Sequence, residues 1–89
     1  MKAILTVLGR DREGIIARVS GLLYESGVNI LDISQTILSG YFTMVLLADL
    51  TNMKIPFARM REGVDGLARE LGLEIRLQRS EIFDAMHRV

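Results

Sequence analysis

The sequence predicts an α+β fold in which two helices pack on one face of a four-stranded antiparallel sheet. Four short runs rich in β-branched and aliphatic residues are separated by two longer segments with the periodicity of amphipathic helices. The order of these segments is β-α-β-β-α-β, which is the order of the ferredoxin-like sandwich. We therefore expect residues 1–79 to form one domain and residues 80–89 to add a short C-terminal helical tail.

Composition limits the possible classes of function. The chain has 89 residues, of which 49% are hydrophobic, and its 11 basic residues balance its 11 acidic ones. A neutral chain without a Lys/Arg block lacks the electrostatic footprint of a nucleic-acid binder. A domain of this size buries only about 60–65% of its unfolded surface. The excess of apolar residues therefore predicts a homodimer or a higher homo-oligomer.

The absence of cysteine excludes disulfides, thiolate metal sites and cysteine nucleophiles, and it fits a reducing compartment. The apolar runs are too short for the core of a signal peptide or for a membrane span. We expect a cytoplasmic protein that does not associate with membranes.

The first strand is predicted over residues 2–8, where both faces are apolar, as is typical of an inner strand, and it is expected to end at Gly9. The first helix is predicted from Ile15, because apolar residues recur with a helical spacing as far as Leu23. Ser26-Gly27 supplies its C-terminal stop.

The second strand is predicted over residues 28–38, with a bulge near Ile30-Leu31 because its alternation is imperfect. Ser39-Gly40 predicts a tight hairpin. The third strand, over residues 41–50, should therefore pair with the second in antiparallel fashion.

The second helix is predicted after Pro56, which suits a first helical turn, and it is expected to end at Gly72. The fourth strand, over residues 73–78, alternates apolar and polar residues. In the tail, Ile82, Phe83 and Met86 fall on one side of a helix. A tail this apolar is expected to dock on its own body or on a neighbouring subunit.

The loop at residues 9–14 is the candidate ligand site. Its two glycines allow close approach of another molecule, and the helix that follows offers unpaired N–H groups and a positive dipole end. The pattern is typical of a site for a small carboxylate. The alternative is that Asp11 only caps the helix and Gly9 only turns the chain.

Nothing in the sequence points to catalysis. His87 is the only histidine, and no serine or carboxylate has a partner placed to activate it. The loop also lacks the Lys-Ser/Thr pair of a phosphate-binding loop and the third glycine of a dinucleotide fingerprint. We expect no enzyme activity, no metal site and no cofactor.

Two segments resemble the ACT domain family. Residues 9–17, GRDREGIIA, are similar to the G-x-D-x-x-G-I/L signature that opens ACT domains, and residues 27–30, GVNI, are similar to the G-x-N-I start of their second strand. Residues 32–36, 40–44 and 82–88 resemble a family of stand-alone prokaryotic ACT proteins with no established activity. Formyltetrahydrofolate deformylase and the glycine cleavage repressor have similar modules.

The resemblance implies a non-catalytic regulatory domain that binds an allosteric effector, usually an amino acid. It also implies side-by-side dimers with a continuous eight-stranded sheet, in which the effector lies between the first loop of one subunit and the second strand of the other. A protein partner in trans is possible, and the alternative is an interaction module with no physiological small ligand. The candidate ligand-binding residues are Gly9, Arg10, Asp11, Gly14, Ile15, Asn29 and Ile30. Arg12 is a further candidate contact to a carboxylate.

Overall fold

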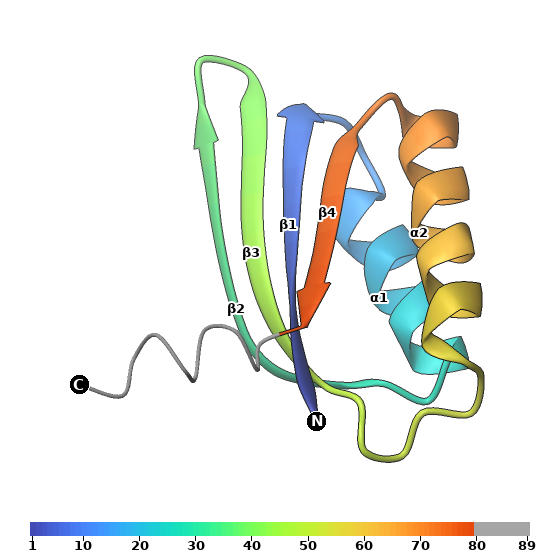
Figure 1. Ribbon diagram of the computed structural model, residues 1–89. Helices are drawn as coiled ribbons and strands as arrows, with labels where there is room; N and C mark the ends of the chain where they lie inside the picture. Colours follow the sequence, from blue (N-terminus) through green and yellow to red (C-terminus); the bar gives the residue numbers. More distant parts are fainter. Residues whose placement is uncertain (80–89) are drawn as a thin grey trace.

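A computed structural model describes residues 1–79 and confirms the predicted order of elements (Figure 1). The elements are β1 (Lys2–Arg10), α1 (Ile15–Glu25), β2 (Asn29–Leu38), β3 (Tyr41–Asp49), α2 (Phe57–Leu71) and β4 (Glu74–Arg79). The predicted helical tail over residues 80–89 lies outside the described residues.

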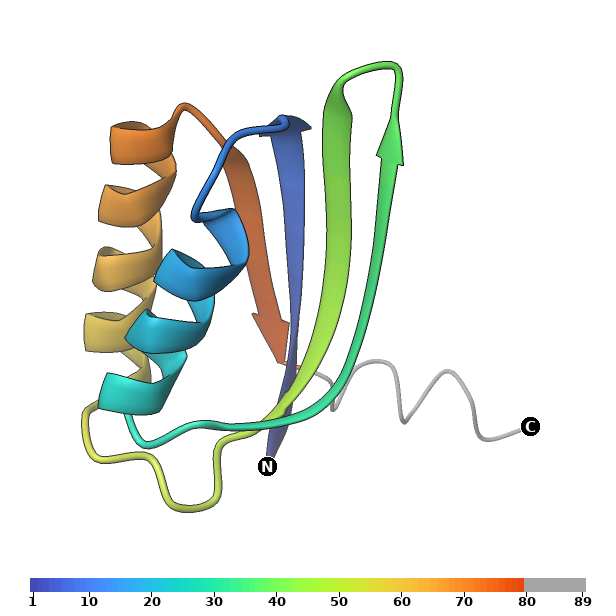
Figure 2. The same cartoon turned by 180° about the vertical axis from the view of Figure 1, so that it is seen from behind.

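The four strands form one sheet in the order β2-β3-β1-β4, and every neighbouring pair is antiparallel. Both helices lie on the same face of this sheet (Figures 1 and 2). Since β1 and β3 are the central strands, β1 is an inner strand, as its apolar composition predicts. The fold is the predicted ferredoxin-like α+β sandwich.

The core lies between the sheet and the two helices. Alternate residues of the central strands point towards the helices and are buried, while the intervening residues face away. The buried apolar residues of these elements are Ala3, Leu5 and Val7 of β1; Phe42, Met44, Leu46 and Ala48 of β3; Ile15, Val19 and Leu23 of α1; and Met60, Val64, Leu67 and Leu71 of α2.

The expectation that Gly9 ends the first strand is wrong, because β1 continues through Arg10. Gly9 pairs with Phe42 inside the sheet. A Cβ atom at Gly9 would lie 2.5 Å from Cδ2 of Leu73 and 3.4 Å from its Cα. The glycine is therefore explained by the close approach of β1 to the α2–β4 turn.

The predicted hairpin and bulge are both present. Ser39 (φ 52°) and Gly40 (φ 80°) adopt the left-handed conformations of a type I′ turn. The pairing between β2 and β3 shifts between Ile30 and Asp32, so Leu31 is the extra residue of a bulge. This bulge decides which side chains of β2 face the helices, because one extra residue inverts the alternation that follows it.

Candidate functional site

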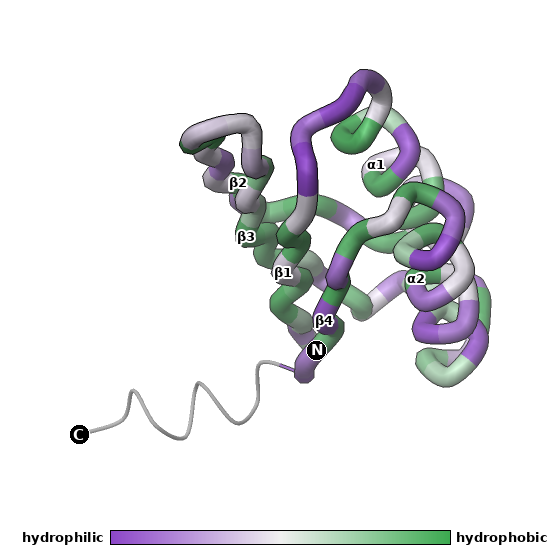
Figure 3. The backbone as a smooth tube through the Cα atoms, turned by 90° about the horizontal axis from the view of Figure 1, so that it is seen from above, coloured by the Kyte–Doolittle hydropathy of each residue, from purple (hydrophilic) through white to green (hydrophobic). Residues whose placement is uncertain are grey.

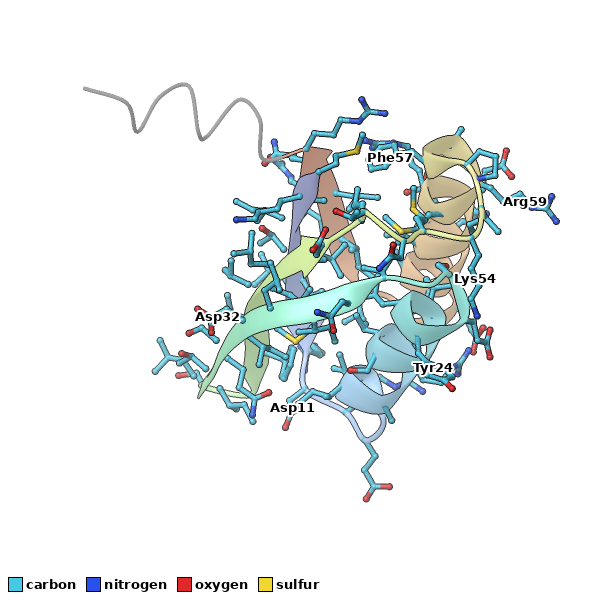
Figure 4. The ribbon with its side chains drawn as sticks, turned by 90° about the horizontal axis from the view of Figure 1, so that it is seen from below. Asp11, Tyr24, Asp32, Lys54, Phe57 and Arg59 are labelled. Atoms are coloured by element: carbon cyan, nitrogen blue, oxygen red, sulfur yellow. The ribbon has the colours of Figure 1, made fainter. Side chains whose placement is uncertain are left out.

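The loop between β1 and α1 consists of residues 11–14, and it is fixed to the neighbouring hairpin. The backbone N–H of Asp11 donates a hydrogen bond of 2.9 Å to the carbonyl oxygen of Gly40. Figure 4 shows Asp11 beside the first turn of α1, at the end of the sheet where β2 and β3 are joined. The start of α1 is therefore held at a defined position relative to β2 and β3.

The N-terminus of α1 has no side-chain cap. Gly14 occupies the N-cap position with a left-handed backbone (φ 85°, ψ 2°), and the first helical hydrogen bond runs from the N–H of Arg18 to the Gly14 oxygen, at 2.8 Å. The alternative in which Asp11 caps the helix is therefore wrong. Helix geometry leaves the N–H groups of residues 15–17 without an intrahelical acceptor. With the positive end of the helix dipole, these groups can receive an anion.

A shallow depression of about 270 Å³ lies between this helix end and β2. One wall comes from the loop and the first turn of α1, and the other from side chains of β2 and β3 that face the helices. The lining residues are Asp11, Arg12, Gly14, Ile15, Ile16, Ala17, Gln35, Ile37 and Phe42. The depression therefore combines unpaired amides, one guanidinium, one side-chain amide and an apolar wall.

Three of the predicted ligand-binding residues, Asp11, Gly14 and Ile15, line this depression. Gly9 does not, because it faces Leu73. Arg10 lies one residue further along β1, on the opposite face of the sheet, and its guanidinium carbon stacks 5.7 Å above the centre of the Tyr41 ring.

The two predicted residues of β2 lie at the other end of the sheet. Asn29 pairs with Asp49, which in turn pairs with Lys2 at the start of β1, whereas the loop follows the end of β1. Nine residues of strand separate the two ends by about 26 Å. Ile30 faces the helices and packs against the core. Within one chain, Asn29 and Ile30 therefore do not meet the loop.

Three residues that line the depression were not among the predicted ligand-binding residues, namely Gln35, Ile37 and Phe42. Without the bulge, the alternation of β2 would have turned Gln35 and Ile37 away from the helices. With the bulge, Gln35 pairs with Met44 and Ile37 pairs with Phe42, so both face the same side as these buried residues. Ile37 is nevertheless 56% exposed, since β2 is an edge strand next to the depression.

Arg12 connects the site to α2. Its guanidinium donates a hydrogen bond of 3.4 Å from Nη1 to the carbonyl oxygen of Leu71, in the last turn of that helix. A cation at a helix C-terminus is favourable. This contact holds the guanidinium of Arg12 beside the C-terminal end of α2. The guanidinium has further N–H groups that can donate to an anion.

One carboxyl group far from the depression has a shifted pKa. Asp49 accepts hydrogen bonds of 2.6 Å from the hydroxyl and 2.9 Å from the backbone N–H of Thr51. Both bonds favour the ionised form and lower the pKa of Asp49, the hydroxyl bond having the larger effect. Asp49 therefore has a structural role in the turn after β3.

Within residues 1–79, no three His, Cys, Asp or Glu side chains come together as a possible metal site. Neither helix in this part of the chain has both the length and the apolar character needed to cross a bilayer. The arrangement at the end of α1 can bind a small anion, and the residues that line it form no nucleophile–base pair.

Comparison with known proteins identifies relatives along the whole chain. Residues 2–78 match the family model of the ACT domain. A UPF0237 protein of Clostridium acetobutylicum is 48% identical over 89 residues, which is 100% of both chains. Among solved structures, an ACT domain protein from Streptococcus pneumoniae is 44% identical with a TM-score of 0.82, and the match covers 98% of each chain.

Two longer proteins contain a similar module, as the sequence resemblance indicated. A formyltetrahydrofolate deformylase from Pseudomonas syringae is 26% identical with a TM-score of 0.82, over 90% of this chain and 28% of that one. A putative glycine cleavage system transcriptional repressor is 25% identical with a TM-score of 0.75, over 88% of this chain and 44% of that one.

Proposed function

The chain belongs to the ACT domain family and to the UPF0237 group of proteins, and we propose that it is a non-catalytic cytoplasmic sensor of an amino acid or a related small carboxylate. ACT domains are typically regulatory ligand-binding domains. The observation that carries the proposal is the depression at the N-terminus of α1, where unpaired amides face an apolar wall.

The two walls of the depression suit the two ends of an amino acid. The amides of residues 15–17 and the guanidinium of Arg12 can bind the carboxylate. The apolar wall formed by Ile37 and Phe42, with Ile16 opposite, can contact the side chain, and the carboxylate of Asp11 can pair with the ammonium group. A volume of about 270 Å³ lies just below the usual range of ligand pockets, about 300–1,000 Å³, which favours a small metabolite over a nucleotide.

The proposal includes a second copy of the chain, because the depression of one copy is open to solvent and a second copy could cover it. β2 is an edge strand, and its outer side is available for pairing. If two β2 strands pair in antiparallel fashion, the Asn29 end of one strand lies beside the Leu38 end of the other, next to the loop at residues 11–14. This arrangement would bring Asn29 and Ile30 of the second copy to the site.

A thermal-shift panel of the twenty amino acids and common organic acids tests the proposal. A ligand at a hundred times its dissociation constant adds about 2.7 kcal/mol to the free energy of unfolding, which is several degrees for a domain of this size. We expect a shift with the wild-type protein that is lost in the Asp11→Ala/Asn29→Ala variant. No shift across the panel contradicts the sensor, and a monomer by light scattering at micromolar concentration contradicts the shared site.

The alternative function, a protein-interaction module without a small ligand, is favoured by exposed apolar side chains near the β2–β3 hairpin. Ile37, Leu38 and Tyr41 are all exposed there. In this case, Asp11→Ala would not affect the pull-down of a protein partner, and no compound of the panel would raise the melting temperature.

A further inference from the structure

The face of the sheet that points away from both helices, here called the open face, has an apolar centre. Figure 3 shows the helices on one side of the sheet and hydrophobic colouring along β1 and β3. On the open face these strands present Ile4, Leu8, Val45 and Leu47. Leu8 is 44% exposed and Val45 is 45% exposed, so residues 1–79 leave this centre in contact with water. Inner strands that are apolar on both faces are normally covered on both faces.

The last described residue, Arg79, lies close to this centre. Arg79 at the end of β4 pairs with Ala3, and the next residue of β1, Ile4, pairs with Leu47 of β3. Neighbouring strands lie about 4.8 Å apart, so Ile4 and Leu47 are one and two strand spacings from β4. Two residues can span about 7 Å when extended, so a connection through Ser80 and Glu81 would be long enough for Ile82 to reach Ile4.

The sequence of residues 80–89 matches the open face in length and in pattern. Ile82, Phe83 and Met86 have the i, i+1, i+4 spacing of one side of a helix. A helix over residues 82–89 would be about 12 Å long, and the four strands span about 14 Å from β4 to β2. One such helix laid across the sheet would cover the exposed centre and direct its charged side to water.

We propose that residues 80–89 dock on the open face of their own chain, with Ile82, Phe83 and Met86 against Ile4, Val45 and Leu47. A second copy fits this face less well. A stable interface between two proteins buries about 800 Å² of each partner. The apolar centre consists of four partly exposed aliphatic side chains, and the exposed Leu38 and Tyr41 lie apart from it at the hairpin end of the same face. The connection from β4 is also short, so docking in the same chain requires no reorganisation of the domain.

Disulfide trapping tests the proposal, because the chain contains no cysteine. Thr6→Cys places a thiol on the open face between Ile4 and Leu8, and Met86→Cys places the other on the apolar side of the segment. The control pairs Met86→Cys with Tyr24→Cys, because Tyr24 is 80% exposed on α1 (Figure 4). Val45→Cys with Met86→Cys repeats the test from β3, in case the Thr6 variant does not fold.

We expect the Thr6/Met86 pair to form an intramolecular disulfide at least about tenfold faster than the Tyr24/Met86 pair, as measured by intact mass and non-reducing gels. Adding Phe83→Asp should remove this difference. A disulfide-linked dimer would show that the segment docks on a second copy and would overturn the proposal. Equal rates for the two pairs, or no disulfide from either open-face position, would also overturn it.

Discussion

Gly9 of β1 and Leu73 before β4 approach each other so closely that a Cβ atom at position 9 would lie 2.5 Å from Cδ2 of Leu73. Leu73 is buried, so its side chain has little room to move. We predict that Gly9→Ala lowers the free energy of unfolding by about 1–2 kcal/mol through overpacking. Urea denaturation measures this change.

A double-mutant cycle with Leu73→Ala attributes the cost to this contact. Once the Leu73 side chain is removed, Gly9→Ala should cost almost nothing further. If Gly9→Ala is equally destabilising in both backgrounds, the contact is not the reason for the glycine.

Gly14 differs from Gly9, because its constraint comes from the backbone. Its φ of 85° is left-handed, and a Cβ atom there would have no neighbour within 4 Å. We predict that Gly14→Val costs about 1–2 kcal/mol of stability through backbone strain alone. Gly14→Asn should cost less, since asparagine tolerates this conformation. Equal stability of the two variants in urea would contradict this explanation.

The hydrogen bonds of Asp49 make the free energy of unfolding depend on pH. Its pKa is lowered from the ordinary value of 3.8 by the hydrogen bonds from Thr51, so the folded state favours the ionised form. The resulting stabilisation is complete above the ordinary pKa and is lost as the pH falls below it, through the lowered value. We predict that wild-type stability declines more steeply than that of Asp49→Asn below about pH 4. Parallel slopes in urea unfolding would contradict this role for Asp49.

Arg10 and Arg12 form a matched pair for testing the site, because they lie two residues apart but face different surfaces. Arg12 lines the depression, whereas Arg10 stacks on Tyr41 on the open face. We predict that Arg12→Ala weakens the binding of a carboxylate ligand about tenfold, and that Arg10→Ala leaves it unchanged. Calorimetry with a ligand from the thermal-shift panel measures both. Equal losses would indicate a general charge effect and not a contact with Arg12.

Most of the fold could be predicted from the sequence, because its signals are local. Gly72 ends α2 in a left-handed conformation, and Ser39-Gly40 forms the hairpin, as glycine chemistry at those positions predicts. The prediction that the first strand ends at Gly9 was wrong, because the constraint on Gly9 comes from Leu73, 64 residues away in the chain. No local pattern could show that contact.

The candidate site was less predictable than the fold. Asp11, Gly14 and Ile15 follow from the loop signature and line the depression. Gln35 and Ile37 could not be placed, because their direction depends on the exact position of the bulge at Leu31. The role of Asn29 stays a prediction, since it depends on a second copy of the chain.

The most direct test of the central claim is an amide NMR titration of the ¹⁵N-labelled protein with the ligand that gives the largest thermal shift. Binding of a carboxylate at the end of α1 predicts saturable shifts of the backbone amides of residues 15–17 and of the side-chain amide of Gln35, all with one dissociation constant. The amides of β4 should stay unchanged. Saturable shifts confined to other elements, with residues 15–17 unaffected, would contradict the site.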